Sequence, residues 1–175
     1  MHIVPLEPRH EAALARFLTD FHAAGESEIP GWFADPAWSH ARTVEKVNAW
    51  AVGQQLPSGW LPCTTLFVEQ GDELLGVVNL RQRLDDRLRR FGGHVGYAVR
   101  PSARRMGVGT KLLNGALAEG GRLGIESFLL TCAPDNHGSI GVILSCGGVF
   151  VDEFFHEGQG RAVRRYRIER PLGSE

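Results

Sequence analysis

Two adjacent arginines, followed by two glycines one residue apart, lie between a strand pattern and a helix pattern in the middle of the chain. Residues 104–110 read Arg-Arg-Met-Gly-Val-Gly-Thr and come after the alternating residues 94–99. Glycine lets the backbone approach an anion closely, because it has no Cβ atom. The free N–H groups and the dipole of a helix start favour negative charge, and arginine adds charge-assisted hydrogen bonds. This arrangement suits a phosphate diester.

Two common nucleotide-binding motifs fail at the same residues. A dinucleotide fingerprint needs a third glycine, but the chain has Leu112 there. A P-loop needs Gly-Lys-Ser/Thr, but Gly109 is followed by Thr110 and then Lys111. The remaining pattern is Arg-x-x-Gly-x-Gly between a strand and a helix. An ordinary strand-to-helix loop that uses glycine only for its turn can have the same pattern. The surrounding segments must therefore distinguish an anion-binding loop from an ordinary connection.

The order of strand and helix patterns predicts a single domain of the α/β (α+β) class over residues 1–175. Strands are predicted at residues 2–6, 64–69, 74–80, 94–99, 127–132, 148–155 and 162–169. Helices are predicted between Pro8 and Gly25, from Ser39 or Thr43 through Ala51, and at residues 109–121 and 138–146. Residues 25–38 and 53–62 are predicted loops, and the charged residues 81–90 are a predicted solvated loop.

Composition excludes several classes of protein. The chain has 175 residues, 43% of them hydrophobic, which is enough for one core. A net charge of −1 argues against broad electrostatic binding to nucleic acid. No apolar run approaches the roughly 18 residues of a membrane span, and the N-terminus lacks a signal-peptide pattern. Three cysteines without a Cys-x-x-Cys pair predict reduced thiols in a cytoplasmic protein and no structural metal site.

The arginine–glycine segment resembles the pyrophosphate-binding loop of the GNAT superfamily of N-acetyltransferases, which bind acetyl-coenzyme A. Asn136-His137-Gly138-Ser139, a helical run and Gly147-Gly148-Val149-Phe150 follow with an order and spacing similar to that superfamily over residues 93–155. A closer resemblance, to one branch of predicted bacterial GNAT acetyltransferases with an unsettled acceptor, covers nearly the whole chain. The segments that carry it are residues 56–65, 80–84, 92–101 and 164–168.

The resemblance implies a GNAT fold, with a mixed and largely antiparallel sheet of about six or seven strands flanked by about four helices. In enzymes of this kind the strand equivalent to residues 94–99 and the next parallel strand splay apart, and coenzyme A enters the gap. The residues that the resemblance assigns to binding acetyl-coenzyme A are Tyr97, Ala98, Val99, Arg104, Arg105, Met106, Gly107, Val108, Gly109, Thr110, Asn136 and Ser139.

Catalytic groups are less clearly marked. Related enzymes often place a glutamate base near the start of the strand at 94–99, where this chain has His94. Histidine titrates near neutrality and can deprotonate an ammonium; the alternative is a backbone hydrogen bond at the strand start. Many relatives carry a proton-donating tyrosine where this chain has Ile143. Tyr97, Ser139 or water are the substitutes.

Acceptor-binding residues are expected in the loop at 25–38 and near its neighbours. Glu26 and Glu28 suit a cationic amine, and Trp32 can line a pocket. Arg81 can face an anionic part of the acceptor or of the donor. The alternatives are solubility for the acids, packing for the tryptophan, and a protective edge-strand charge for the arginine.

These residues predict an N-acetyltransferase that moves an acetyl group from acetyl-coenzyme A to a primary amine of a small molecule or a protein. Direct attack is favoured over an acetyl-cysteine on Cys132, because a buried cysteine more often fills the core. A non-catalytic sensor that binds acyl-coenzyme A is the alternative. The expected partners are acetyl-coenzyme A and an amine, with no metal, nucleic acid or membrane, in a monomer or a homodimer.

Overall fold

The computed structural model describes residues 1–170, and residues 171–175 at the end of the predicted domain lie outside the described residues. The strands are β1 (His2–Pro5), β2 (Cys63–Gln70), β3 (Glu73–Arg81), β4 (Val95–Val99), β5 (Ser127–Cys132), β6 (Val149–His156) and β7 (Arg161–Glu169). The helices are α1 (Glu11–Ala23), α2 (His40–Ala51), α3 (Asp86–Arg90), α4 (Val108–Arg122) and α5 (His137–Ser145). Each predicted strand and helix is present, with ends within a few residues of the prediction.

The described strands form two antiparallel sheets. One has the order β1-β2-β3-β4 and the other the order β5-β7-β6. In the first, Val78 of β3 lies opposite Tyr97 of β4; in the second, Leu130 of β5 lies opposite Tyr166 of β7. The α/β class is confirmed, and the strands of the expected central sheet are divided between these two sheets.

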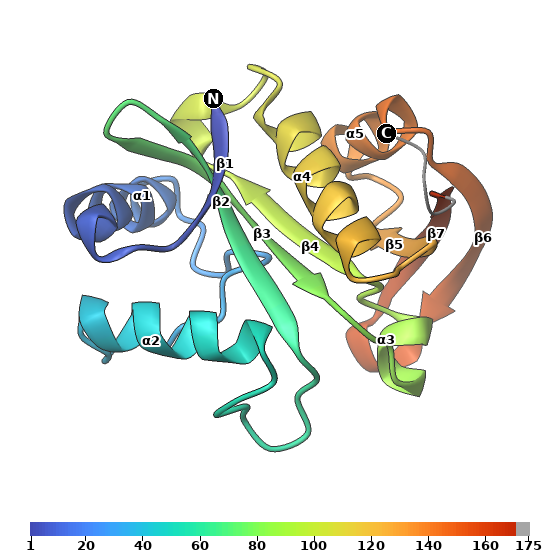
Figure 1. The fold of residues 1–175 in the computed structure, drawn as a ribbon. Helices are drawn as coiled ribbons and strands as arrows, with labels where there is room; N and C mark the ends of the chain where they lie inside the picture. The colour runs from blue at the N-terminus through green and yellow to red at the C-terminus, as the bar shows by residue number, and fades with distance from the viewer. Residues whose placement is uncertain (171–175) are drawn as a thin grey trace.

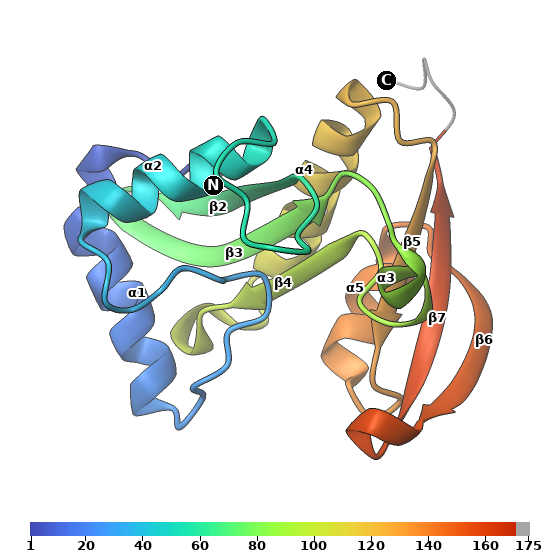
Figure 2. The ribbon, with the colours of Figure 1, turned by 90° about the horizontal axis from the view of Figure 1, so that it is seen from below.

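A glycine pair and a histidine form the junction between the sheets. The His94 N–H donates to the Leu129 carbonyl at 2.7 Å, and the Leu129 N–H donates to His94 Nδ1 at 2.9 Å. Gly93 has φ +57°, and a Cβ atom there would lie 2.3 Å from the Leu129 oxygen, so only glycine fits. Beyond this junction β4 and β5 diverge (Figure 2).

Helices cover both faces of the four-stranded sheet (Figure 1). On one face Phe67 and Val77 pack with Trp50 and the rest of the α1–α2 cluster. On the other face Val68 and Val78 pack with α4. Because neighbouring strand residues point to opposite faces, both faces of β2 and β3 are buried, which explains their nearly continuous apolar sequence.

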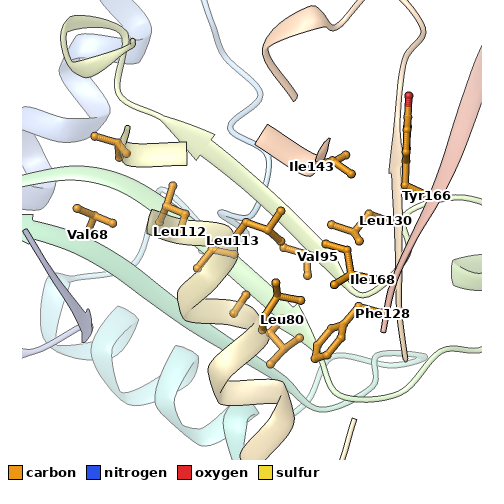
Figure 3. Close-up of a cluster of buried hydrophobic side chains, with 14 of the residues drawn as sticks. Val68, Leu80, Val95, Leu112, Leu113, Phe128, Leu130, Ile143, Tyr166 and Ile168 are labelled. Atoms are coloured by element: carbon orange, nitrogen blue, oxygen red, sulfur yellow. The ribbon is translucent and has the colours of Figure 1, made fainter. Parts of the chain in front are cut away.

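Helix α4 also holds the two sheets together. Leu112 and Leu113 lie among side chains from both, including Val95 of β4 and Phe128 of β5 (Figure 3). All four are at most 5% exposed. The packing of α4 therefore fixes the relative position of the two strands that diverge.

One prediction about local structure is wrong: residues 81–90 are not all loop. Helix α3 occupies the second half of the segment. The Asp85 side chain caps it by accepting the Leu88 N–H at 2.7 Å, and Leu88 is buried. A capping carboxylate and one buried leucine stabilise a short helix despite the high charge of the segment.

Candidate functional site

A cavity of about 680 Å³ lies between the end of β4 and the start of α5, the helix that follows β5. Its wall is built from the end of β4, the loop before α4, the first turn of α4 and the first half of α5. The residues of the wall that the sequence predicted are Tyr97, Ala98, Val99, Arg104, Arg105, Gly107, Val108, Gly109, Thr110, Asn136 and Ser139. Met106 was predicted with them, but its side chain is 55% exposed and is not part of the wall. We call this space the donor cavity.

The turn before α4 presents backbone N–H groups to the donor cavity. Arg105 and Gly107 both have positive φ angles, +65° and +79°, and Gly107 is the N-cap residue of α4. The Lys111 N–H donates to the Gly107 carbonyl at 3.1 Å. Because the first N–H groups of a helix have no partner within the helix, the start of α4 favours an anionic ligand.

Gly109 lets α4 begin close to α5 and β4. A Cβ atom at this position would lie 3.0 Å from Val142 Cγ2 and 3.7 Å from Tyr97 Cε2. A larger side chain would push these elements apart or fill the donor cavity. The second glycine of the sequence motif therefore serves packing at the cavity as well as access to the backbone.

Arg104 and Glu26 form an ion pair at the donor cavity. Arg104 Nη2 lies 2.7 Å from Glu26 Oε2, and the two side chains are 47% and 37% exposed. Glu26 was predicted to bind the acceptor, but the structure places it in the wall of the donor cavity beside the arginine. The pair joins the loop at 25–38 to the loop at 104–107.

Tyr97 crosses the donor cavity and reaches the start of α5. Its hydroxyl lies 3.1 Å from Ser139 Oγ, and burial raises the pKa of Tyr97 to about 12. Asn136 caps α5 by accepting the Ser139 N–H at 3.0 Å. Ile143, at the position where many relatives have tyrosine, is 1% exposed and lies in the core. The phenol in the wall of the donor cavity is therefore that of Tyr97.

His94 lies at the sheet junction and not in the wall of the donor cavity. Its Nδ1 accepts the Leu129 N–H, and its ring packs edge-on against Phe128 with the centroids 5.7 Å apart. Burial, together with Arg89 and Arg81, lowers the pKa of His94 to about 4. This is the backbone hydrogen bond that the sequence offered as the alternative to a catalytic base.

The remaining predicted acceptor residues line two other cavities. Glu28 and Trp32 border a space of about 710 Å³ between α1, the loop at 25–38 and α2. Trp32 also packs on Phe67, with the ring centroids 5.7 Å apart. Arg81 lines a smaller cavity of about 140 Å³. Sequence reasoning missed Asn79, which is 1% exposed and borders the same cavity; its place within an apolar strand was the only signal.

Two further observations limit the chemistry of the described residues. Residues 1–170 bring together no group of three His, Cys, Asp or Glu side chains that could hold a metal ion. Within the same range, no helix has both the length and the apolar character that a membrane span needs.

Comparison with known proteins gives a family and a set of similar structures. The family model of the acetyltransferase (GNAT) family matches residues 26–147, more than two thirds of the chain. None of the curated proteins matches the sequence.

Three solved structures illustrate the similarity in fold. A putative acetyltransferase from Salmonella typhimurium with acetyl-CoA is 15% identical with a TM-score of 0.64, covering 99% of this chain and 96% of its own. RimJ from Mycobacterium smegmatis, in complex with CoA-disulfide, is 17% identical with a TM-score of 0.67, covering 95% and 80%. A spermidine N-acetyltransferase from Vibrio cholerae is 20% identical with a TM-score of 0.62, covering 97% and 95%.

Proposed function

The chain belongs to the acetyltransferase (GNAT) family, and from that premise we propose that it transfers the acetyl group of acetyl-coenzyme A directly to a primary amine. The observation that carries the proposal is the donor cavity. It combines two arginines, a turn with two positive φ angles and a helix N-terminus beside the end of β4 and the start of α5. Each of these features favours a pyrophosphate.

Coenzyme A would lie along the donor cavity. Arg104, Arg105 and the N–H groups of residues 107–110 would hold the pyrophosphate. Strand β4 pairs only with β3, so its other edge is free of strand partners among the described residues. The N–H and C=O groups of residues 97–99 on that edge would bind the pantetheine amides and the thioester carbonyl, because an unpaired strand edge offers alternating donors and acceptors.

Transfer then needs few further groups. The amine nitrogen attacks the thioester carbon, a C–N bond forms, and the C–S bond breaks with its electron pair passing to sulfur. Positioning and N–H donors to the carbonyl oxygen supply most of the rate. We assign to Tyr97 a hydrogen bond to the departing sulfur. Since its pKa lies well above that of an ordinary thiol, Tyr97 stabilises the thiolate and stays protonated, and solvent supplies the final proton.

We assign His94 a positioning role in place of the predicted role as base. Its Nδ1 accepts a backbone hydrogen bond, so the neutral ring carries its proton on Nε2 and has no free lone pair for an ammonium proton. A pKa of about 4 also makes it a weak base at neutral pH. Water would therefore take the proton of the amine.

The test measures binding and turnover separately. Calorimetry with acetyl-coenzyme A would give the affinity, and release of free thiol with a panel of primary amines would give the activity. Binding together with amine-dependent thiol release supports the proposal. Binding without turnover on any amine would favour the sensor alternative, and absence of binding would contradict both.

A further inference from the structure

A half-buried arginine, Arg81 at the end of β3, lines the small cavity of about 140 Å³. Arg81 Nη1 donates to the carbonyls of Gly92 and Gly93 at 2.9 Å and 3.1 Å. These bonds hold the guanidinium beside the sheet junction. The groups that influence its pKa through charge are Cys63 and Arg87, and no carboxylate is among them. Within residues 1–170 no carboxylate forms an ion pair with Arg81.

The other guanidinium nitrogens of Arg81 are accessible to solvent. Nε and Nη2 of Arg81 have no hydrogen-bond partner among the described residues. Among residues 1–170, every side-chain nitrogen or oxygen that is fully buried has a hydrogen-bond partner, so Nε and Nη2 are not fully buried. The two nitrogens are therefore accessible to solvent, and Arg81 lines the cavity of about 140 Å³ together with Phe33, Trp60, Cys63, Asn79 and Arg87.

The charges around this cavity favour an anion. Burial lowers the pKa of Arg81, and the like charge of Arg87 lowers it further. Arginine nevertheless stays protonated in proteins, so the site keeps an uncompensated positive charge. A half-buried charge without an opposite charge is poorly compensated, and a carboxylate that accepts two parallel N–H groups of one guanidinium would neutralise it with good geometry.

Arg81 lies against β4 next to a residue of the donor cavity. A Cβ atom on Gly96 would lie 3.4 Å from Arg81 Nη2, and the next residue, Tyr97, lines the donor cavity. An anion bound to Arg81 would therefore lie beside β4, the strand whose next residues we assign to the thioester.

The loop at 25–38 forms one wall of the small cavity through Phe33. A Cβ atom on Gly31 would lie 2.4 Å from the Gly96 oxygen, so the loop rests directly on the strand. That contact places Phe33 over Arg81, with the guanidinium carbon 5.9 Å from the ring centroid. Phe33 in turn packs edge-on against Trp60 at 5.4 Å. The two aromatic rings cover part of the guanidinium, and the remaining cavity of about 140 Å³ has room for a carboxylate.

We propose that this cavity binds the carboxylate of the acceptor, and that the acceptor is a small molecule that carries both a primary amine and a carboxylate, such as a free amino acid. The inference rests on the proposed acetyl transfer. Arg81 would bind the carboxylate through Nε and Nη2, Arg87 would add charge at the cavity mouth, and the amine would lie toward Tyr97 and the thioester.

The experiment compares amino acids with their carboxamides. Glycine, alanine and leucine, and the amide of each, are titrated into the protein loaded with coenzyme A, and the same pairs are assayed for thiol release with acetyl-coenzyme A. The amide removes the negative charge at nearly constant size. The amine of the amide is also less basic, so more of it is unprotonated at neutral pH. This difference favours the amide and makes a preference for the acid harder to obtain by chance. We expect the acid to be preferred over the amide by about 10- to 100-fold, the loss typical of one charge-assisted pair.

Three variants locate the preference. Arg81→Gln should reduce the acid-to-amide ratio to within about threefold of one, with the affinity for acetyl-coenzyme A unchanged, and Arg81→Lys should restore only part of the ratio. Arg87 is exposed, and Arg87→Gln should reduce the acid-to-amide ratio by about two- to fivefold. This variant remains informative if the Arg81 variants do not fold. Arg83→Gln is the matched control, since Arg83 is exposed and outside the cavity wall; its ratio should equal that of the unaltered protein.

The outcomes separate this inference from the proposed function. Thiol release with amides or simple amines as good as with the acids, or an unchanged ratio in both Arg81→Gln and Arg87→Gln, would overturn the carboxylate site and leave acetyl transfer standing. Binding of the acids to the coenzyme A-loaded protein without thiol release would support the carboxylate site and contradict the transfer. No preference in either measurement, with activity only on peptides that have amidated C-termini, would also overturn the site.

Discussion

The ion pair between Arg104 and Glu26 leads to an unusual prediction: removing an acidic residue from the donor cavity should strengthen binding of acetyl-coenzyme A. The two side chains meet at 2.7 Å and both remain more than one third exposed. Such a pair contributes about 0.2–1 kcal/mol. A pyrophosphate that binds Arg104 must break this ion pair. The Glu26 carboxylate then lies unpaired beside the negative charge of the pyrophosphate.

The expected magnitude follows from that exchange. Glu26→Gln should raise the affinity for acetyl-coenzyme A by about 1.4- to 5-fold, which corresponds to 0.2–1 kcal/mol. Arg104→Ala removes a charge-assisted hydrogen bond and should lower the affinity by about 10- to 150-fold. In the Arg104→Ala background Glu26→Gln should have a smaller effect, because the partner of the pair is absent.

Calorimetry on the four proteins of this cycle, at low and at high salt, measures these effects. The gain from Glu26→Gln should shrink at high salt, since both groups are solvent-exposed and screening weakens their interaction. Glu28→Gln is the matched control, because Glu28 lies in the same loop but borders a different cavity. A loss of affinity in Glu26→Gln comparable to that in Arg104→Ala would refute the reasoning, since it would mean that Glu26 positions Arg104 for the ligand.

Three further predictions concern the neighbouring residues. Tyr97→Phe removes one hydrogen bond to a charged group and should lower kcat by about 10- to 100-fold with little change in acetyl-coenzyme A affinity, measured by steady-state thiol release; an unchanged kcat would remove Tyr97 from the chemistry. His94→Gln should destabilise the fold by about 1–3 kcal/mol in urea unfolding and leave the pH profile of activity unaltered. Because the pKa of His94 is depressed from 6.5 to about 4 in the folded protein, its share of the stability is present above pH 6.5 and is lost as the pH falls toward 4; a variant that loses as much stability as the unaltered protein between pH 6.5 and 4 would contradict this assignment. Cys132→Ser should keep activity within about threefold, since burial raises the pKa of the Cys132 thiol and disfavours the nucleophilic thiolate; a stable acetyl adduct on Cys132 in mass spectrometry would overturn direct transfer.

The order of elements could be predicted from the sequence because strand and helix patterns are local, and the family could be predicted because residues 104–110 and the segments after them resemble the GNAT superfamily. Alternating residues in the strands and helical spacing in α1 and α4 act over a few neighbouring positions. The segment at 104–110 is continuous, so its turn and helix start form wherever the strand before it ends. The same local reasoning failed for α3, where one cap and one buried leucine outweighed a highly charged composition.

The sequence by itself determined the donor cavity's main wall, whereas only the tertiary structure decided the roles of the isolated residues around it. Glu26 lies 78 positions from Arg104, and His94 lies 35 positions from Leu129, so no local pattern relates either pair. Arg81 likewise reads as an edge-strand charge until the glycine pair at 92–93 and the loop at 25–38 are folded around it. The physical reason is that the type of a side chain sets what chemistry it offers, while burial and partners, which come from distant parts of the chain, set its charge state and whether its polar atoms remain free.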